Sequence, residues 1–290
     1  MNRELRIALA LASVASSALA QGEAKFEKFQ FELEGGWSQF KADTSPEFES
    51  TDLAVVGTYH LKPVALASNP WNEAAFLERS TFFQAGLDFA EVEQAGFSSD
   101  GVVYGLGGRY ADKESPLAAE VTFLTGSLTG DADIDLSDLS GRVGYWCMSN
   151  AILGLSLGRA TTEIETLPDV EVVSFGAFGK IVHDLGEGRA VNFAAELDFV
   201  SVDDTTSTED NVEFGLLADY YFTQKVSLGA QAKISSGDNG ASEGTTLGVR
   251  GSMWFTPQLS ANASYSHFAV DDDALGSDDD TISLFFIARF

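Results

Sequence analysis

The residues that could do acid–base or metal chemistry are few and widely spaced. The sequence has three histidines, His60, His183 and His267, and one cysteine, Cys147. Zinc sites need three or four such ligands in one place, and we expect His60 and His183 at the opposite strand ends from His267. A single cysteine forms no internal disulfide. We therefore assign no metal site and expect no cofactor.

One arrangement near His267 could serve nucleophilic catalysis. Ser264 and Ser266 lie close to this histidine, and Asp271 follows it. A serine nucleophile requires a base in contact with it and an acid that orients the base. Closeness in sequence does not establish those contacts, so we assign no catalytic residues and expect a protein that is not an enzyme. A hydrolase stays open as a distant alternative.

Acidic residues dominate the charge of the chain. The net charge is −27, from 44 acidic and 17 basic residues, which argues against nucleic-acid binding because phosphates would be repelled. Many of the acids lie in clusters: Asp131, Asp133, Asp135, Asp138, Asp203, Asp204, Glu209, Asp210, Asp271, Asp272, Asp273, Asp278, Asp279 and Asp280. The first cluster resembles a calcium-binding loop. Leu136 stands where that loop needs a glycine and Arg142 where it needs a bidentate acid, so we predict no EF-hand.

The elements around these clusters follow an alternation with period two, which predicts strands. In 190–199 and 281–290, for example, every second residue is apolar. We expect fourteen strands in an all-β, antiparallel, up-and-down transmembrane barrel. Their expected ranges are 26–40, 51–61, 80–93, 101–111, 117–129, 134–146, 151–162, 170–183, 189–202, 211–222, 225–235, 244–255, 258–270 and 281–290.

The connections between these strands alternate in length. Long acidic ones are expected at 41–50, 94–100, 130–138, 163–170, 203–210, 236–243 and 271–280, and short ones at 112–116, 147–150, 184–188, 223–224 and 256–257. Outer-membrane barrels have long extracellular loops and short periplasmic turns. Strands that enter the short turns tend to end in aromatic residues, as membrane-interface girdles do: Tyr59, Tyr110, Tyr145, Tyr220, Phe222, Phe255 and Phe290.

The first twenty residues read as a signal peptide. Arg3 and Arg6 precede an apolar core, and 18–20 fit the small-x-small cleavage pattern. We expect cleavage after Ala20, which leaves a barrel domain at 21–290 and sends the chain to a bacterial outer membrane. The last strand resembles the signal read by the outer-membrane assembly machinery, through Ile282, Leu284, Phe286 and Phe290.

Charged side chains on the polar faces of these strands must point into the barrel, because a charge cannot face lipid cheaply. The expected pore-lining residues are Glu32, Glu34, Asp88, Arg109, Glu120, Arg142, Glu196, Asp198, Glu213, Asp219, Lys233 and Arg250, with Arg289 beside them. Opposed rows of acid and base would make a transverse field at a constriction. The alternative is that these charges pair and fill the lumen.

The connection at 62–79 is too long for a periplasmic turn, and its composition from 71 to 79 favours a short helix. This region, with Tyr59, Pro63 and Val64 before it and 73–77 (EAAFL) within it, resembles the putative general bacterial porins of Gram-negative bacteria. The runs 103–110 and 218–222 resemble two further strands of that family. Trp71 and Asn72 stand where the family has smaller residues.

The resemblance implies an outer-membrane barrel that passes small solutes and adds no catalytic residues. Together with the acidic loops, which would attract cations, it predicts a water-filled diffusion channel that prefers cations. Partners would be outer-membrane lipid and lipopolysaccharide, the assembly machinery, small solutes and cations. The alternative is a structural or adhesive barrel without a channel, whose acidic extracellular loops bind a partner or divalent cations. Whether 62–79 plugs the lumen is open at this point.

Overall fold

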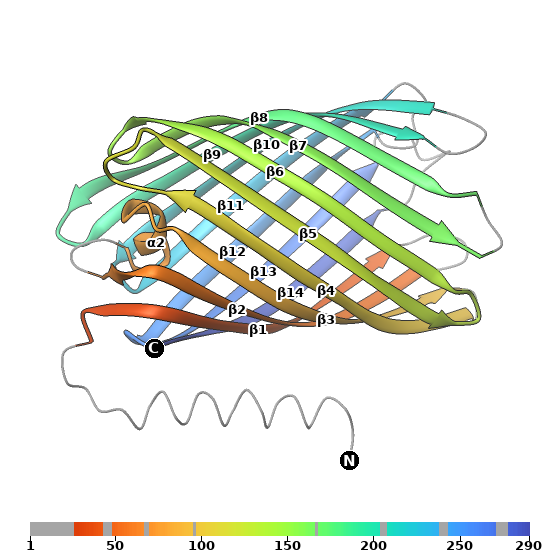
Figure 1. Cartoon of the computed structure of the whole chain (residues 1–290), viewed down its shortest axis with the longest axis horizontal. Helices are drawn as coiled ribbons and strands as arrows, with labels where there is room; N and C mark the ends of the chain where they lie inside the picture. The colour runs from red at the N-terminus through yellow and green to blue at the C-terminus, as the bar shows by residue number, and fades with distance from the viewer. Residues whose placement is uncertain are drawn as a thin grey trace, which may run out of the picture.

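The protein forms a closed antiparallel barrel. The computed structural model describes residues 26–42, 48–66, 70–94, 97–165, 168–203, 208–237, 243–270 and 278–290. The predicted signal peptide with its cleavage site at Ala20, and the acids Asp204 and Asp271 to Asp273, lie outside these residues. Each strand pairs with its neighbours in sequence, and β14 closes the barrel against β1 (Figure 1).

The fourteen predicted strands are all present, with bounds close to those expected. They are β1 (Lys28–Ala42), β2 (Phe48–Ala65), β3 (Phe82–Gln94), β4 (Phe97–Ala111), β5 (Leu117–Gly130), β6 (Ile134–Met148), β7 (Ala151–Ile164), β8 (Val170–Gly186), β9 (Arg189–Asp203), β10 (Thr208–Thr223), β11 (Val226–Gly237), β12 (Gly244–Thr256), β13 (Leu259–Val270) and β14 (Asp279–Arg289). The even count brings both ends of the barrel sequence to one rim, where Phe31 N donates to the carbonyl of Phe290 at 3.1 Å.

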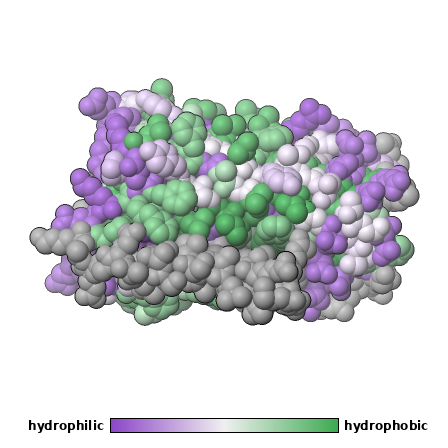
Figure 2. All heavy atoms as spheres, turned by 60° about the horizontal axis from the view of Figure 1, so that its bottom comes forward, coloured by the Kyte–Doolittle hydropathy of each residue, from purple (hydrophilic) through white to green (hydrophobic). Residues whose placement is uncertain are grey.

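The alternation places apolar side chains on the outside of the barrel. Leu155, Leu157 and Phe193 are more than half exposed, and so are many others of their kind. On the face drawn in Figure 2, hydrophobic residues gather in a band between two hydrophilic ends. A continuous apolar band of this kind is stable only against lipid. The predicted girdle aromatics Tyr110 and Tyr145 also lie on this outer face.

Two of the long connections predicted from the sequence are wrong. β3 ends at Gln94 and β4 begins at Phe97, and these two residues are register partners. β6 begins at Ile134, and only three residues separate it from the end of β5 at Gly130. The strands continue past the apolar band because backbone pairing does not require apolar side chains: Ser98 pairs with Glu93, and Asp100 pairs with Thr129. Loss of apolar alternation therefore marked the edge of the band rather than the end of the strand.

A helical segment follows β2, as the composition predicted. It comprises the 3-10 turn η1 (Trp71–Glu73) and the short helix α2 (Ala74–Leu77). α2 lies at the end of the barrel where the C-terminus lies, which is also the end with the short turns (Figure 1). No helix in the described ranges is long and apolar enough to cross a membrane.

Candidate functional site

The interior of the barrel carries the charged residues expected there. The strand register puts all twelve on the inner face: Glu32, Glu34, Asp88, Arg109, Glu120, Arg142, Glu196, Asp198, Glu213, Asp219, Lys233 and Arg250. The ion pair between Arg142 on β6 and Glu196 on β9, at 3.0 Å, joins strands that are not neighbours. Such a contact requires both side chains to project from the inner face and to meet over β7 and β8.

Most of the bases on this inner face pair with acids of nearby strands. Besides Arg142 with Glu196, Lys233 contacts Glu213 at 2.8 Å. Arg289 donates to Glu32 at 2.8 Å.

Arg109 faces Glu120 in the register of β4 and β5 without an ion pair closer than 4 Å in the described part of the chain. Glu34 and Asp88 have no lysine or arginine within that distance there.

Opposed rows of acid and base do not form. Glu34 and Asp88 lie on β1 and β3, and Asp198 and Asp219 lie on β9 and β10, on the other side of the barrel. The arginines and lysines fall between these two acidic arcs. The expected transverse field is therefore wrong in form, because these bases pair with acids on the adjacent strand or up to three strands away along the same wall, rather than with acids on the opposite wall.

Glycines make some of these contacts possible. Asp219 on β10 and Arg250 on β12 form a two-point ion pair, with Arg250 Nε donating to Oδ1 at 2.7 Å. Gly229 of β11 lies between them, and a Cβ there would come within 2.0 Å of the same carboxylate oxygen. Gly176 likewise lies beneath the hydrogen bond from Ser156 to Asp198. An inner-face glycine on the middle strand leaves the space through which its two neighbours meet.

Residues 70–80, here called the plug, fold into the barrel at its short-turn end. Trp71 N donates to the carbonyl of Gln224 at 3.0 Å, in the turn between β10 and β11. The indole of Trp71 packs edge-on against that of Trp254, with ring centroids 6.0 Å apart. Asn72 donates to Ser252 Oγ at 2.6 Å and accepts from Trp254 Nε1 at 2.5 Å. The plug thus spans from β2 to β12.

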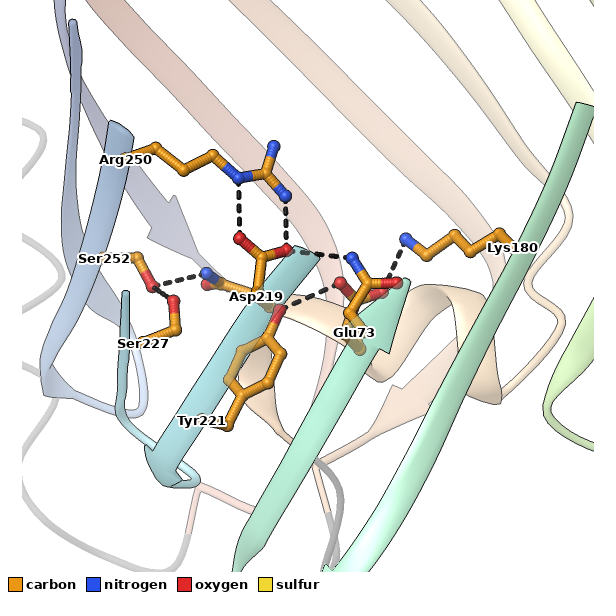
Figure 3. A network of polar contacts seen from close by, with 9 residues as sticks. Glu73, Lys180, Asp219, Tyr221, Ser227, Arg250 and Ser252 are labelled. Atoms are coloured by element: carbon orange, nitrogen blue, oxygen red, sulfur yellow. Dashed lines mark hydrogen bonds and ion pairs between the residues drawn. The ribbon is translucent and has the colours of Figure 1, made fainter. Parts of the chain in front are cut away.

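Glu73 makes the central polar contact of the plug (Figure 3). Its carboxylate accepts from Lys180 Nζ of β8 at 2.7 Å and from the hydroxyl of Tyr221 of β10 at 2.9 Å. The Glu73 side chain is only 7% exposed, so losing either donor would leave a buried charge poorly compensated. Asn192 extends the network by donating to Asp219 at 2.9 Å.

The apolar side of the plug packs on the inner wall. Phe76 lies 4.8 Å from Trp146, between ring centroids, and Lys180 Nζ lies over the Phe76 ring at 4.6 Å. Around them is a buried cluster of Ala111, Ala118, Ile152, Val182, Ala190 and Tyr221. Burying a side chain of the size of Phe76 contributes about 1.5–3 kcal/mol, so this contact fixes the plug in place.

The far end of the plug is also anchored. Arg79 adopts a φ of 49°, a left-handed conformation that ends α2 and turns the chain back toward β3. Its guanidinium lies over Trp146 and donates to the carbonyl of Met148 at 3.0 Å. His60, 1% exposed, bridges Ser80 and Glu32 at 2.8 and 3.0 Å.

Two cavities flank the plug on the side away from the short turns. The larger, about 450 Å³, lies between the plug and strands β10 to β14 and β1, and the polar plug residues Asn72 and Glu73 line it. The smaller, about 180 Å³, lies against β4 to β9, where Phe76 lines it together with Arg109 and Arg142. The plug therefore presents a polar side to one cavity and an aromatic ring to the other.

The possible hydrolase arrangement is not assembled. Ser264 and Ser266 lie on the inner face of β13, and His267 lies on the outer face, where it contacts Asp280 at 3.1 Å. Asp271 is outside the described residues. Within the described ranges no three His, Cys, Asp or Glu side chains are grouped so as to hold a metal ion.

Comparison with known proteins supports the class of fold. A closed fourteen-strand barrel with a polar interior and an apolar belt is the fold of outer-membrane proteins. The chain matches no protein-family model and no curated protein sequence. It is similar to the crystal structure of the Acinetobacter baumannii outer membrane protein Omp33, with 20% identity and a TM-score of 0.56, over 91% of this chain and 99% of that one.

Two further solved structures are less similar. The translocator domain of the autotransporter NalP from Neisseria meningitidis has 11% identity and a TM-score of 0.48, over 99% of this chain and 98% of that one. The Pseudomonas putida toluene transporter TodX has 11% identity and a TM-score of 0.47, over 93% and 92%.

Sequence reasoning missed the plug's partners. Alternation would have placed Lys180 and Tyr221 on the inner face, but their pairing with Glu73 joins residues 107 and 148 positions away. The departure of Trp71 and Asn72 from smaller residues was the available signal, since both of these larger side chains anchor the plug to β12.

Proposed function

We propose that this chain is an outer-membrane channel for the passive diffusion of small hydrophilic solutes, and that the plug holds its closed state. The observation that carries the proposal is the inner face of the barrel, whose charged side chains surround cavities beside the plug. Eight-stranded barrels are filled by their side chains, and larger ones leave room for a channel. Fourteen strands give a lumen that a segment of the chain can both enter and leave.

The proposal includes a preference for cations. Of the twelve inner-face residues predicted from the sequence, eight are acids and four are bases, and Arg289 and Lys180 on the same face raise the bases to six. Glu34 and Asp88 have no lysine or arginine within 4 Å among the described residues. A wall with unpaired carboxylates raises the local concentration of cations.

Location and partners follow from the same reasoning. The apolar band fits an outer-membrane bilayer flanked by lipopolysaccharide, and the predicted signal peptide would direct export. β14 presents Ile282, Leu284 and Phe286 outward, as a strand read by the assembly machinery would. The proposal involves no catalytic step.

A second function has a specific observation in its favour. The plug is held by a buried ion pair and two tryptophans, as a permanently closed structural barrel would require. In that case the acidic extracellular loops would bind a partner or divalent cations.

Planar-bilayer recording of the purified mature chain separates the two functions. Stable single-channel steps, rare if the plug is tightly docked, support the channel. A folded, heat-modifiable barrel that stays silent, even after the plug is deleted, would refute the channel and leave the structural barrel.

A further inference from the structure

The larger cavity beside the plug has the size of a binding site for a small molecule. Its volume is about 450 Å³, and small-molecule sites span roughly 300–1,000 Å³. Its walls come from the plug and from six strands, so it closes around a guest from several sides. It extends from the Asn72–Ser252 contact away from the short turns, toward the side that a solute from outside would reach first.

Part of this wall is a rigid polar frame. Asp219, Tyr221 and Arg289 are each less than 5% exposed, and each is bonded to another residue of the barrel or the plug. Arg289 is also held between the rings of Phe29 and Trp254, 4.1 and 4.0 Å from its guanidinium carbon. Side chains fixed in this way are already ordered before a ligand arrives, which lowers the entropy cost of binding.

One carboxylate on the cavity wall has no basic partner among the described residues. Four acids line the cavity. Arg289 compensates Glu32, Arg250 compensates Asp219, and Lys180 compensates Glu73. Glu34 remains, next to Glu32 on the same face of β1 and with no base within 4 Å in the described part of the chain. An uncompensated carboxylate in a partly enclosed site favours a cationic guest.

Other unengaged groups surround Glu34. Asn262 and Ser264, on the inner face of β13, line the cavity and make no side-chain hydrogen bond to any described residue. Phe285 and Ile287 form an apolar part of the wall, on the same face of β14 as Arg289. Gly36 makes room for the Phe285 ring, because a Cβ there would lie 2.1 Å from the ring's Cδ1.

From this combination we infer that the larger cavity binds a compact, hydroxylated monocation, such as an amino sugar. The ammonium would pair with Glu34, hydroxyls would bond to Asn262 and Ser264, and the apolar face of the sugar ring would lie on Phe285. This inference rests on the proposed channel function, for which it names a class of solute.

The test is calorimetric titration of the folded full-length barrel in detergent with glucosamine and with glucose, its neutral counterpart. Glucosamine should bind roughly tenfold or more tightly than glucose, since hydrogen bonds between charged groups are worth more than a decade of affinity. Glu34→Gln should abolish the difference between the two sugars. Asp88→Asn is the matched control, because Asp88 is an inner-face acid outside the cavity without a basic partner, and it should keep the difference.

The outcomes separate this inference from the channel function. Equal affinity for both sugars in the wild type, or an unchanged preference in Glu34→Gln, overturns the inference even if the protein conducts. Glucosamine binding in a barrel that never conducts supports the site and refutes the channel. If Glu34→Gln does not fold, Asn262→Ala replaces it: that variant should lose affinity for glucosamine and glucose alike, and unchanged affinities would overturn the inference.

Discussion

The two cavities beside the plug differ in how their charges are balanced. In the smaller one Arg142 is paired with Glu196, Lys180 is paired with Glu73, and Arg109 faces a carboxylate across the β4–β5 ladder. In the larger one the pairs leave Glu34 over. The smaller cavity is a gap left where Phe76 packs on the barrel wall. The larger cavity has hydrogen-bonding groups without protein partners, as a ligand-binding site does. Proximity to the plug alone therefore does not define a binding cavity.

Deleting the plug removes the boundary between the two cavities and should have the largest effect. Replacing residues 70–80 with a short Gly-Ser linker would convert rare or absent channel openings into long-lived open steps, because one continuous lumen would remain. Single-channel recording measures this, and heat-modifiability on gels checks that the barrel still folds. Conductance identical to that of the wild type would mean that the plug does not block the pathway.

Glu73→Ala tests the ion pair that holds the polar side of the plug. The change leaves the Tyr221 hydroxyl and Lys180 without their acceptor, at a cost of about 1–3 kcal/mol. Because the Lys180 side chain is 30% exposed, we expect the lower half of this range, seen as an increased open probability.

Glu78→Ala is the control for Glu73→Ala, because Glu78 belongs to the same plug and pairs with Lys113, which is 60% exposed. An exposed pair of this kind contributes about 0–1 kcal/mol. Equal effects of the two changes would show that burial of Glu73 does not matter.

Ion selectivity should depend on the unbalanced cavity more than on the balanced one. Glu34→Gln should lower the ratio of cation to anion permeability, because it removes the uncompensated carboxylate. Replacing Arg142 and Glu196 together with methionine removes a neutral pair and should leave the ratio nearly unchanged. Reversal potentials in a salt gradient measure both, and an anion preference in the wild type would contradict the proposed cation preference.

The smallest effect is expected outside both cavities, in the turn between β4 and β5. The Glu114 backbone N–H, and then Lys62, hold the pKa of Asp112 below its usual value. Its contribution to stability is therefore present above the ordinary aspartate pKa and is lost as the pH falls through the lowered one. Thermal unfolding of wild type and Asp112→Asn should differ slightly at pH 7 and converge at acidic pH, and a difference that grows on acidification would contradict this.

The barrel could be predicted well from the sequence because the alternation of apolar and polar residues within each strand shows which face is apolar. Alternation placed Glu196 and Lys233 on the inner face without any knowledge of their partners. It failed at Phe97, where pairing continues beyond the apolar band, and it gave no information on the partners of Glu73. Those depend on contacts across the lumen, which no local pattern encodes. Of the candidate site, residue orientation was predictable, and the division of the lumen by the plug was not.

The glycines beneath the cross-strand contacts also help to set the register of the strands. If β11 slipped by two residues it would keep its faces, but Gln231 or Ser227 would then lie where Gly229 lies, beneath the Asp219 carboxylate. A one-residue slip would turn its apolar face inward. Backbone hydrogen bonding would be equally satisfied after a two-residue slip. The space at Gly229 is therefore what distinguishes the correct register from the slipped one. The Asp219–Arg250 pair thus favours one register of β11, although neither residue belongs to that strand.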